Sequence, residues 1–216
     1  GLGSGVALDG KTFFYPNPLE SNGQHARQEW FGVACCPGNI TRFMPSVPGY
    51  LYATRGDGVL YVNLFAQGSA DIDLSGGKVK VVQTTKYPWD GAVTIAVTPE
   101  RARPAGPKLA ATPSSEGRRF AINVRIPGWA RNEPVPSDLY RFTDAAPAAT
   151  LRVNGQPVPM TLDKGYVTID RTWTAGDTIA LNLPMPVRRV LSNDQVIANR
   201  NRVALQRGPI VCSSRA

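Results

Sequence analysis

The chain has 216 residues, of which 42% are apolar and 19% charged, and this composition is typical of a globular protein with one large or two small domains. The net charge of +8 does not indicate a nucleic-acid partner, because the arginines are scattered singly and form no basic run. No apolar segment approaches the ~18 residues of a membrane-spanning helix. The three cysteines are too few for a disulfide framework. We therefore expect no nucleic-acid partner and no membrane span.

The first 50 residues are irregular and rich in Gly, Asn and Pro. We expect a short helix to start after Pro37, because proline suits the first helical turn, and Pro45 and Pro48 would limit it to about two turns. The segment has too little apolar surface to form a domain alone, so we interpret it as the edge of something larger. We expect residues 1–30 to be held loosely, because the segment offers no partner for its apolar residues Phe13, Phe14 and Trp30.

From about residue 51 the pattern changes to short β-branched and aromatic runs separated by turn signals. In FAINVRI, apolar residues alternate with Ala, Asn and Arg, as in a strand with one buried face. RVNGQP predicts a hairpin on an Asn-Gly type I′ turn, and residues 101–118 form a long polar loop. The fold class is therefore mainly β, an antiparallel β-sandwich of the jelly-roll kind. The expected strands are GVLYVNLFA, KVKVVQTTKYP, AVTIAVTP, RRFAINVRIPGWA, ATLRVNGQPV, GYVTIDRTW, DTIALNLPM and RVALQRGPIVC.

Two of the three cysteines, Cys35 and Cys36, are adjacent and are followed at once by Pro-Gly. Neighbouring thiols are poor disulfide partners, because the ring they would close is strained. The two cysteines are therefore packed thiols, ligands of a soft metal ion, or reactive thiols. A closed zinc site needs four ligands, and this chain offers few others. We interpret His25 as a surface residue and Cys212 as a packed thiol in a strand.

The segment WFGVACCPGNITRF, preceded by FFYPNPLES and followed by PGYLYA, resembles the active-site segment of glycoside hydrolase family 127. These enzymes are bacterial β-L-arabinofuranosidases and their relatives. The later blocks RVNGQPV, KGYVTIDRTWTAGDTIALNLPMPVR and RVALQRGPIV resemble the β-sandwich region of the same family, in family order. The resemblance covers most of the chain, and the Cys-Cys-Pro-x-Asn block is its specific part.

The resemblance implies a division of the chain into three parts. Residues 1–50 would be the last piece of the family's catalytic (α/α)6 barrel, residues 51–190 a β-sandwich domain, and residues 191–216 the start of a further β region. The rest of the helical barrel would then be a partner that this sequence does not contain. The compartment stays open between the cytoplasm and the periplasm or exterior, with any leader outside the sequence.

The resemblance also implies a chemistry for the cysteine pair. Cys35 occupies the position of the family's nucleophile and of a zinc ligand, and Cys36 that of a second zinc ligand. Zinc coordination deprotonates a thiol, and the thiolate is the nucleophilic form. The acid/base glutamate and the other two zinc ligands would lie upstream of Gly1. We interpret Glu20 and Glu29 as solvated loop carboxylates rather than as substitutes for them.

Residues around the pair are candidates for substrate contact. Tyr15 would line the sugar pocket or pack, whereas Asn39 and Arg42 would contact substrate, orient the cysteine loop or cap a short helix. The expected substrate is a plant-derived oligosaccharide or glycan that contains arabinose. The four tryptophans are weaker candidates for stacking on a sugar. For Trp129 and Trp173 we expect packing at strand ends instead.

The resulting hypothesis is a C-terminal fragment of a retaining, zinc-thiolate glycoside hydrolase with Cys35 as nucleophile. Because half of the site would be missing, we expect the 216-residue chain alone to be inactive and to bind zinc weakly or not at all. Two alternatives from other classes remain, a non-catalytic carbohydrate-binding module and a structural β-sandwich that braces a barrel.

Overall fold

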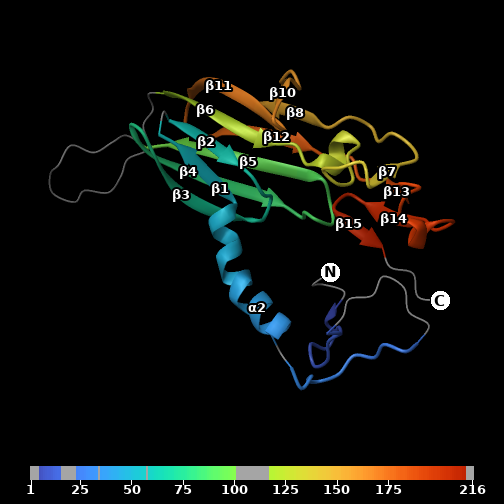
Figure 1. Ribbon diagram of the computed structural model, residues 1–216. Coiled ribbons are helices and arrows are strands. Elements are labelled where there is room, and N and C mark those ends of the chain that lie inside the picture. The colour runs from blue at the N-terminus through green and yellow to red at the C-terminus, as the bar shows by residue number, and fades with distance from the viewer. Residues whose placement is uncertain (1–4, 16–22, 34, 57, 101–116, 213–216) are drawn as a thin grey trace. The chain divides into compact units, whose positions relative to one another are not determined.

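The computed structural model describes residues 5–15, 23–33, 35–56, 58–100 and 117–212 (Figure 1). Most of the predicted polar loop therefore lies outside the described residues. The contacts between residues divide the chain into two compact units. They comprise residues 1–49 with 211–216, and residues 50–210. Each unit is described by itself below.

A short helix follows the irregular N-terminal residues, as predicted. Helix α2 spans Cys35–Phe43 and continues into the 3-10 helix η1, Met44–Tyr50. The helix begins two residues before Pro37 rather than after it, so this proline stands in the first turn, where no backbone N–H is needed. It ends at Phe43 because Met44 precedes Pro45, and a residue before proline is disfavoured in the α conformation.

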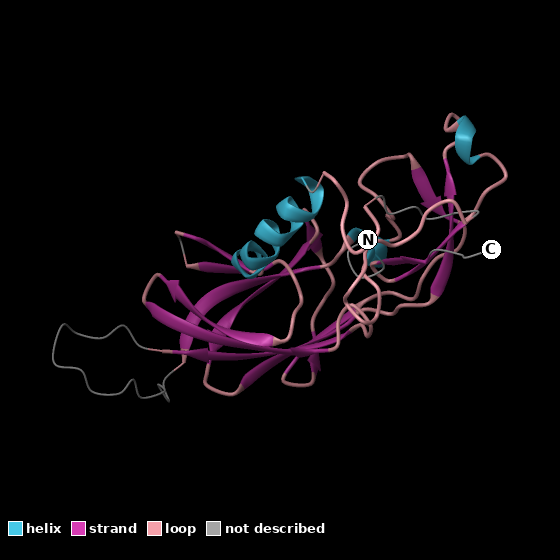
Figure 2. Cartoon of the chain, turned by 90° about the horizontal axis from the view of Figure 1, so that it is seen from below, coloured by secondary structure: helices cyan, strands magenta, loops and turns pink. Residues whose placement is uncertain are grey.

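The described residues of the second unit are dominated by strands, with helix only in short stretches (Figure 2). One sheet has five strands in the order β1-β2-β6-β11-β10. Strand β11 pairs with β6 over eight residues, from Tyr166 opposite Arg125 to Trp173 opposite Arg118. The strand bounds are β1 Tyr52–Arg55, β2 Val59–Val62, β6 Arg118–Arg125, β10 Leu162–Asp163 and β11 Tyr166–Trp173.

A second sheet has six strands in the order β3-β4-β5-β12-β8-β9, and all of its pairs are antiparallel. Asn154 and Gly155 both have positive φ, 50° and 79°, and connect β8 to β9 as the predicted type I′ turn requires. The strand bounds are β3 Gly68–Leu74, β4 Gly77–Thr85, β5 Ala92–Pro99, β8 Thr150–Val153, β9 Gln156–Pro157 and β12 Asp177–Asn182.

One strand pair departs from the predicted antiparallel arrangement. Strands β2 and β6 run parallel, with Val59 opposite Ala121 and Val62 opposite Val124. The chain passes through β3, β4 and β5 of the other sheet between these two strands, and parallel neighbours need such a long connection. The five-stranded sheet is therefore mixed, and the sandwich is otherwise antiparallel.

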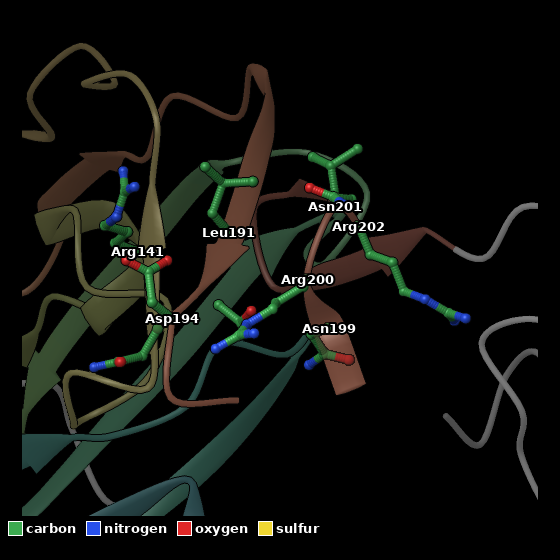
Figure 3. A pocket seen from close by; sticks show the side chains of 10 residues that line it. Arg141, Leu191, Asp194, Asn199, Arg200, Asn201 and Arg202 are labelled. Atoms are coloured by element: carbon green, nitrogen blue, oxygen red, sulfur yellow. The ribbon is translucent and has the colours of Figure 1, made fainter. Parts of the chain in front are cut away.

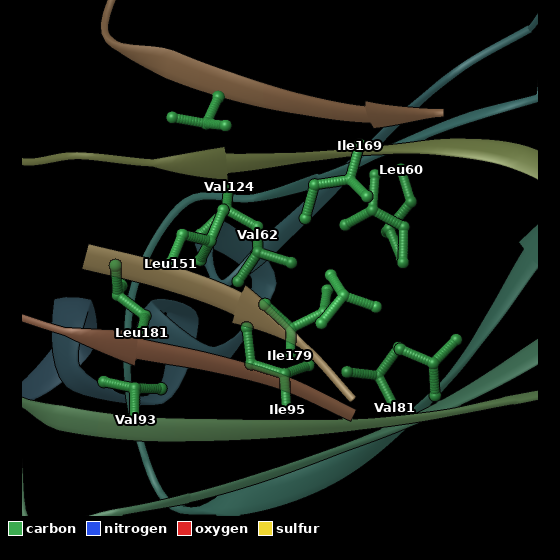
Figure 4. Close-up of a cluster of buried hydrophobic side chains, with 14 of the residues drawn as sticks. Leu60, Val62, Val81, Val93, Ile95, Val124, Leu151, Ile169, Ile179 and Leu181 are labelled. Carbon is green, nitrogen blue, oxygen red and sulfur yellow. The ribbon is translucent and has the colours of Figure 1, made fainter. Parts of the chain in front are cut away.

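The two sheets bury one hydrophobic core between them (Figure 4). Strand β6 presents Phe120, Ile122 and Val124 to this core, as the alternation predicted, while Arg125 is exposed. Trp173 is fully buried and donates its indole N–H to the backbone oxygen of Phe120 at 3.0 Å. The packing role predicted for this tryptophan is confirmed.

A third sheet has four strands in the order β15-β14-β13-β7, and its strand β7 precedes β8 to β12 of the sandwich in the chain. Arg188 of β13 is buried, and its guanidinium donates to the backbone oxygens of Trp129 and Asp144 and covers the ring of Phe142 at 3.4 Å. The contact with Trp129 connects the third sheet to the segment that follows β6. The strand bounds are β7 Tyr140–Phe142, β13 Val187–Ser192, β14 Ala204–Arg207 and β15 Ile210–Cys212.

Cys212 was predicted to be packed, and this is wrong. It is the last residue of β15, which is the edge strand of the third sheet, and its side chain is exposed. No helix within the described residues is long and apolar enough to cross a membrane.

Candidate active-site segment

Cys35 is the first residue of helix α2, and its side chain is exposed. The hydroxyl of Tyr15 lies 2.9 Å from its Sγ, at hydrogen-bond distance, and either atom is able to donate. The first backbone N–H groups of a helix have no partner within the helix, so a thiolate at this position meets their positive end. The arrangement therefore pairs a potential nucleophile with a phenol that is able to donate to it.

A cluster of aromatic rings holds Tyr15 in place. The Tyr15 ring packs against Phe31 with their centroids 5.5 Å apart, and Phe31 in turn meets Phe13 edge-on at 5.2 Å. Phe13 also contacts Trp30, at 6.5 Å. The prediction that Phe13 and Trp30 lack partners is therefore wrong, because they pack on each other and on Phe31, although Trp30 remains 64% exposed.

Backbone hydrogen bonds fix this cluster from both sides. Phe13 exchanges both of its backbone hydrogen bonds with Gln28, at 2.9 and 3.0 Å, and forms a bridge with Val6. Arg27 covers the ring of Phe14 at 4.4 Å and donates to the backbone oxygen of Gly5. Phe14 therefore also has a partner, contrary to the prediction. The three short stretches around residues 5–7, 12–14 and 28 together support Tyr15.

Asn39 and Arg42 lie on helix α2 and interact with each other. The Arg42 guanidinium donates a hydrogen bond to the Asn39 side-chain oxygen, three residues earlier on the helix. Residues at this spacing lie on the same helix face. This contact lies within the helix, and the substrate, orienting and capping roles considered for these two residues stay predictions.

The described residues do not complete a metal centre. No three His, Cys, Asp or Glu side chains within them lie close enough together to hold a metal ion. His25 and Glu29 are exposed, as predicted, and Glu20 lies outside the described residues. Cys36 follows Cys35 in the first turn of α2, but its side chain is outside the described part of the chain.

Sequence reasoning missed Phe31, which packs between Tyr15 and Phe13. Its signal was the spacing of two aromatic runs, Phe-Phe-Tyr at 13–15 and Trp-Phe at 30–31, on either side of the sequence Ser-Asn-Gly, which is typical of turns. The pairing of Phe13 with Gln28 brings these runs together. A hairpin-like pairing between them was not predicted.

Comparison with known proteins assigns this segment and the sandwich to one family. A family model described as the GH127 beta-L-arabinofuranosidase catalytic domain matches residues 1–49. A second, described as the GH127 middle domain, matches residues 59–185, which is more than half of the chain. The chain belongs to glycoside hydrolase family 127. The resemblance read from the cysteine motif is confirmed.

Individual relatives match almost the whole chain. The non-reducing end beta-L-arabinofuranosidase of Bifidobacterium longum subsp. longum is 35% identical over 222 residues. A solved GH127 beta-arabinofuranosidase matches with a TM-score of 0.82 at 42% identity, and a GH127 beta-L-arabinofuranosidase from Geobacillus stearothermophilus T6 with 0.76 at 37%. Each match covers 96% of this chain.

The same matches cover only part of each relative. The chain spans 29% of the Bifidobacterium protein and 30% of each of the two solved GH127 chains. Only 49 residues of this chain match the GH127 catalytic domain. These 49 residues, the cysteine segment, include Tyr15, Cys35 and Cys36.

Proposed function

We propose that this chain supplies the nucleophile segment and a supporting β-sandwich to a retaining GH127 glycoside hydrolase that acts on β-L-arabinofuranosides. The observation that carries the proposal is the contact of Cys35 with Tyr15, 2.9 Å from Sγ to the hydroxyl, within the segment that matches the GH127 catalytic domain. The relatives named for β-L-arabinofuranosidase activity support arabinofuranosides as the substrate class. We further propose that the substrate is a plant-derived oligosaccharide or glycan that contains arabinose.

In the proposed reaction the Cys35 thiolate attacks the anomeric carbon of the sugar. A C–S bond forms while the glycosidic C–O bond breaks, and a general acid protonates the departing oxygen. Water then gives a proton to the conjugate base of that general acid and attacks the same carbon, which breaks the C–S bond and releases the Cys35 thiolate, so that two inversions retain the configuration. Sulfur takes the role that a carboxylate has in most retaining glycosidases. The Tyr15 hydroxyl would donate to the thiolate and orient Sγ toward the sugar.

The donor chemistry of the cysteine pair fits part of a zinc site. Zinc favours thiolate ligands in a tetrahedral arrangement, and an exposed thiol such as Cys35 is accessible to the ion. We propose that Cys35 and Cys36 are two of four ligands, and that bound zinc keeps the thiol deprotonated. The other two ligands and the general acid would come from GH127 residues outside this sequence. The chain alone would then be inactive and would bind zinc weakly or not at all.

A chimera tests this proposal in a complete site. The matched 29% of the Bifidobacterium enzyme is replaced by this chain, and hydrolysis of a chromogenic β-L-arabinofuranoside is measured together with bound zinc. The chimera should be active. Cys35→Ala should abolish turnover, and Cys36→Ala should remove both zinc and activity.

Cys212→Ala is the matched control in the chimera, because Cys212 is also exposed but lies on strand β15, outside the cysteine segment. It should leave activity and zinc content unchanged. A folded chimera whose Cys35→Ala variant keeps its activity would overturn the nucleophile assignment. For the isolated chain, one zinc per monomer that survives dialysis against a mild chelator would show that the ligands have been misplaced.

A further inference from the structure

The third sheet opens into a groove where strand β13 leaves β14 and continues along β7 (Figure 3). The groove has a volume of about 640 Å³, within the ~300–1,000 Å³ typical of ligand sites in proteins. Its walls come from the end of β13, from Arg141 of β7 and from the connection of residues 193–203 that includes the 3-10 helix η3, Ile197–Asn199. All of these residues belong to the second unit, and none lies in the cysteine segment.

Hydrogen bonds hold the walls of this groove in place. Asn193 donates its backbone N–H to Leu139 at 2.7 Å, and its side-chain oxygen accepts from the backbone of Gln195 at 3.0 Å. At the other end of the connection, Arg200 and Arg202 donate their backbone N–H groups to the preceding turn. The groove is therefore formed before any ligand arrives, which reduces the entropy cost of binding.

Three charged side chains of the groove, those of Arg141, Asp194 and Arg200, are exposed to solvent. None of these side chains forms a hydrogen bond or ion pair with another described residue. The Arg200 side chain extends toward the side on which Arg141 and Asp194 lie, whereas Arg202 extends the other way (Figure 3). Two guanidinium groups and one carboxylate thus leave a net positive charge in the groove.

This mixture of groups favours a particular ligand chemistry. A guanidinium binds a carboxylate through two parallel hydrogen bonds, and amides, hydroxyls and carboxylates bind sugar hydroxyls. Asn201, Ser192 and Asp194 supply such groups, and Leu191 and Val203 offer apolar surface to sugar C–H groups. Asp194 would repel a phosphate dianion, but it accepts hydrogen bonds from hydroxyls. A hydroxyl-rich ligand with single carboxylates matches all of these features.

We propose that this groove is a binding site for acidic oligosaccharides, in which the carboxylates of uronic acid residues pair with Arg200 and with Arg141. The site is separate from the cysteine segment in sequence and requires no catalytic step. It would attach the protein to glycan chains in which uronic acids occur. The groove shares no residue with the cysteine segment, so oligosaccharide binding there does not depend on the assignment of Cys35 as nucleophile.

Titration of the full 216-residue chain with two matched disaccharides tests the proposal. Digalacturonate should bind with a saturable change in NMR chemical shifts or in the heat of binding. Neutral digalactose should bind at least about tenfold more weakly. Arg200→Gln and Arg141→Gln should each weaken digalacturonate binding about tenfold, the loss of one charge-assisted pair. Raising the salt concentration should weaken binding of the acidic sugar more than that of the neutral one.

Arg189→Gln is the control variant, because Arg189 is an exposed arginine of the same strand β13 but does not line the groove. It should bind digalacturonate like the unaltered chain, and circular dichroism should show the same fold for all variants. Equal affinity for the neutral and acidic disaccharides would overturn the proposal. So would equal losses in the Arg189 and Arg200 variants, or binding of inorganic phosphate or a short oligonucleotide as tight as that of digalacturonate.

Discussion

The β-sandwich and the cysteine segment are stabilised in different ways. Within the described residues, every buried hydrophobic side chain lies between Val59 and Val190, and most of them join the one core shared by the two sheets. The cysteine segment instead combines a few backbone hydrogen bonds with ring contacts among half-exposed aromatic residues. The buried core stabilises the sandwich. Cys35 and Tyr15 instead lie in a segment without buried hydrophobic side chains among its described residues, and this segment has low intrinsic stability.

Hydrogen exchange should show the largest contrast between the two regions. The amides of Phe13 and Gln28 are hydrogen-bonded to each other, and so are those of paired strands such as β6 and β11. We expect the β6 and β11 amides to exchange only through near-global unfolding, with a free energy of opening of about 5–15 kcal/mol. The Phe13 and Gln28 amides should exchange through local opening, with a free energy of opening of about 0–2 kcal/mol. Strong protection across residues 5–30 in the isolated chain would contradict this picture.

Two tryptophans offer the same chemical change in the two regions. Trp173 is fully buried and hydrogen-bonded to Phe120, whereas Trp30 is 64% exposed. Trp173→Ala should lower the free energy of unfolding by about 3–5 kcal/mol, through lost burial and a cavity. Trp30→Ala should change it by less than about 0.5 kcal/mol. Urea unfolding followed by circular dichroism measures both, and equal losses would mean that the cysteine segment belongs to the same cooperative unit.

Asp177 connects two turns of the sandwich and should make its stability depend on pH. Burial alone would raise the pKa of this carboxyl, but hydrogen bonds from Thr174 and Asn154 and the charge of Arg171 outweigh it and hold the pKa below its usual value. A carboxyl with a lowered folded-state pKa stabilises the protein above its unfolded-state pKa, about 3.9, and the contribution disappears as the pH falls through the folded-state value.

Asp177→Asn should therefore cost about 1–3 kcal/mol of unfolding free energy at pH 7, and the cost should shrink as the pH falls below about 4. Asp170→Asn is the control, because Asp170 forms a surface ion pair with Arg119 at 3.0 Å and its side chain is 50% exposed. That variant should lose less than about 1 kcal/mol. Urea titrations at a series of pH values test this, and a loss at Asp177 that does not change with pH would contradict it.

The sandwich was largely predictable because its sequence alternates strongly. The runs around Ile122, Ile95 and Ile169 read as half-buried strands, and they are the centre of the core. Strand β3, Gly68–Leu74, was missed although Ala70, Ile72 and Leu74 alternate with Asp71 and Asp73, because Gly and Asp are rare in strands and Ile72 is the one β-branched residue of the run. Strand β13 was missed because its consecutive arginines read as polar loop, although Arg188 is buried against Phe142. The parallel pairing of β2 with β6 depends on the path through the other sheet, which no local pattern records.

The cysteine segment was predictable in a different respect. Its motif identified the family and the candidate residues Cys35 and Tyr15, but not how the chain brings them together. Their contact depends on the pairing of Phe13 with Gln28 and on Phe31. Such contacts arise between irregular stretches without hydrophobic periodicity, so periodicity could not reveal them.

The smallest expected effect is the removal of one hydroxyl from this segment. Tyr15→Phe deletes the group 2.9 Å from Cys35 Sγ but keeps the ring that packs on Phe31. We expect the free energy of unfolding to change by less than about 0.5 kcal/mol, because the contact is exposed. The thiolate is the form that reacts with alkylating agents, and it would lose a hydrogen-bond donor.

Alkylation of Cys35 at fixed pH should therefore slow by about two- to tenfold in the Tyr15→Phe variant, the kinetic equivalent of one modest hydrogen bond. Cys212 is an exposed thiol on strand β15 and serves as an internal reference in the same chain. Peptide mapping by mass spectrometry follows both sites, and the Cys212 rate should not change. If Cys35 slows no more than Cys212, Tyr15 does not stabilise the thiolate, and its place in the segment is explained by ring packing against Phe31 alone.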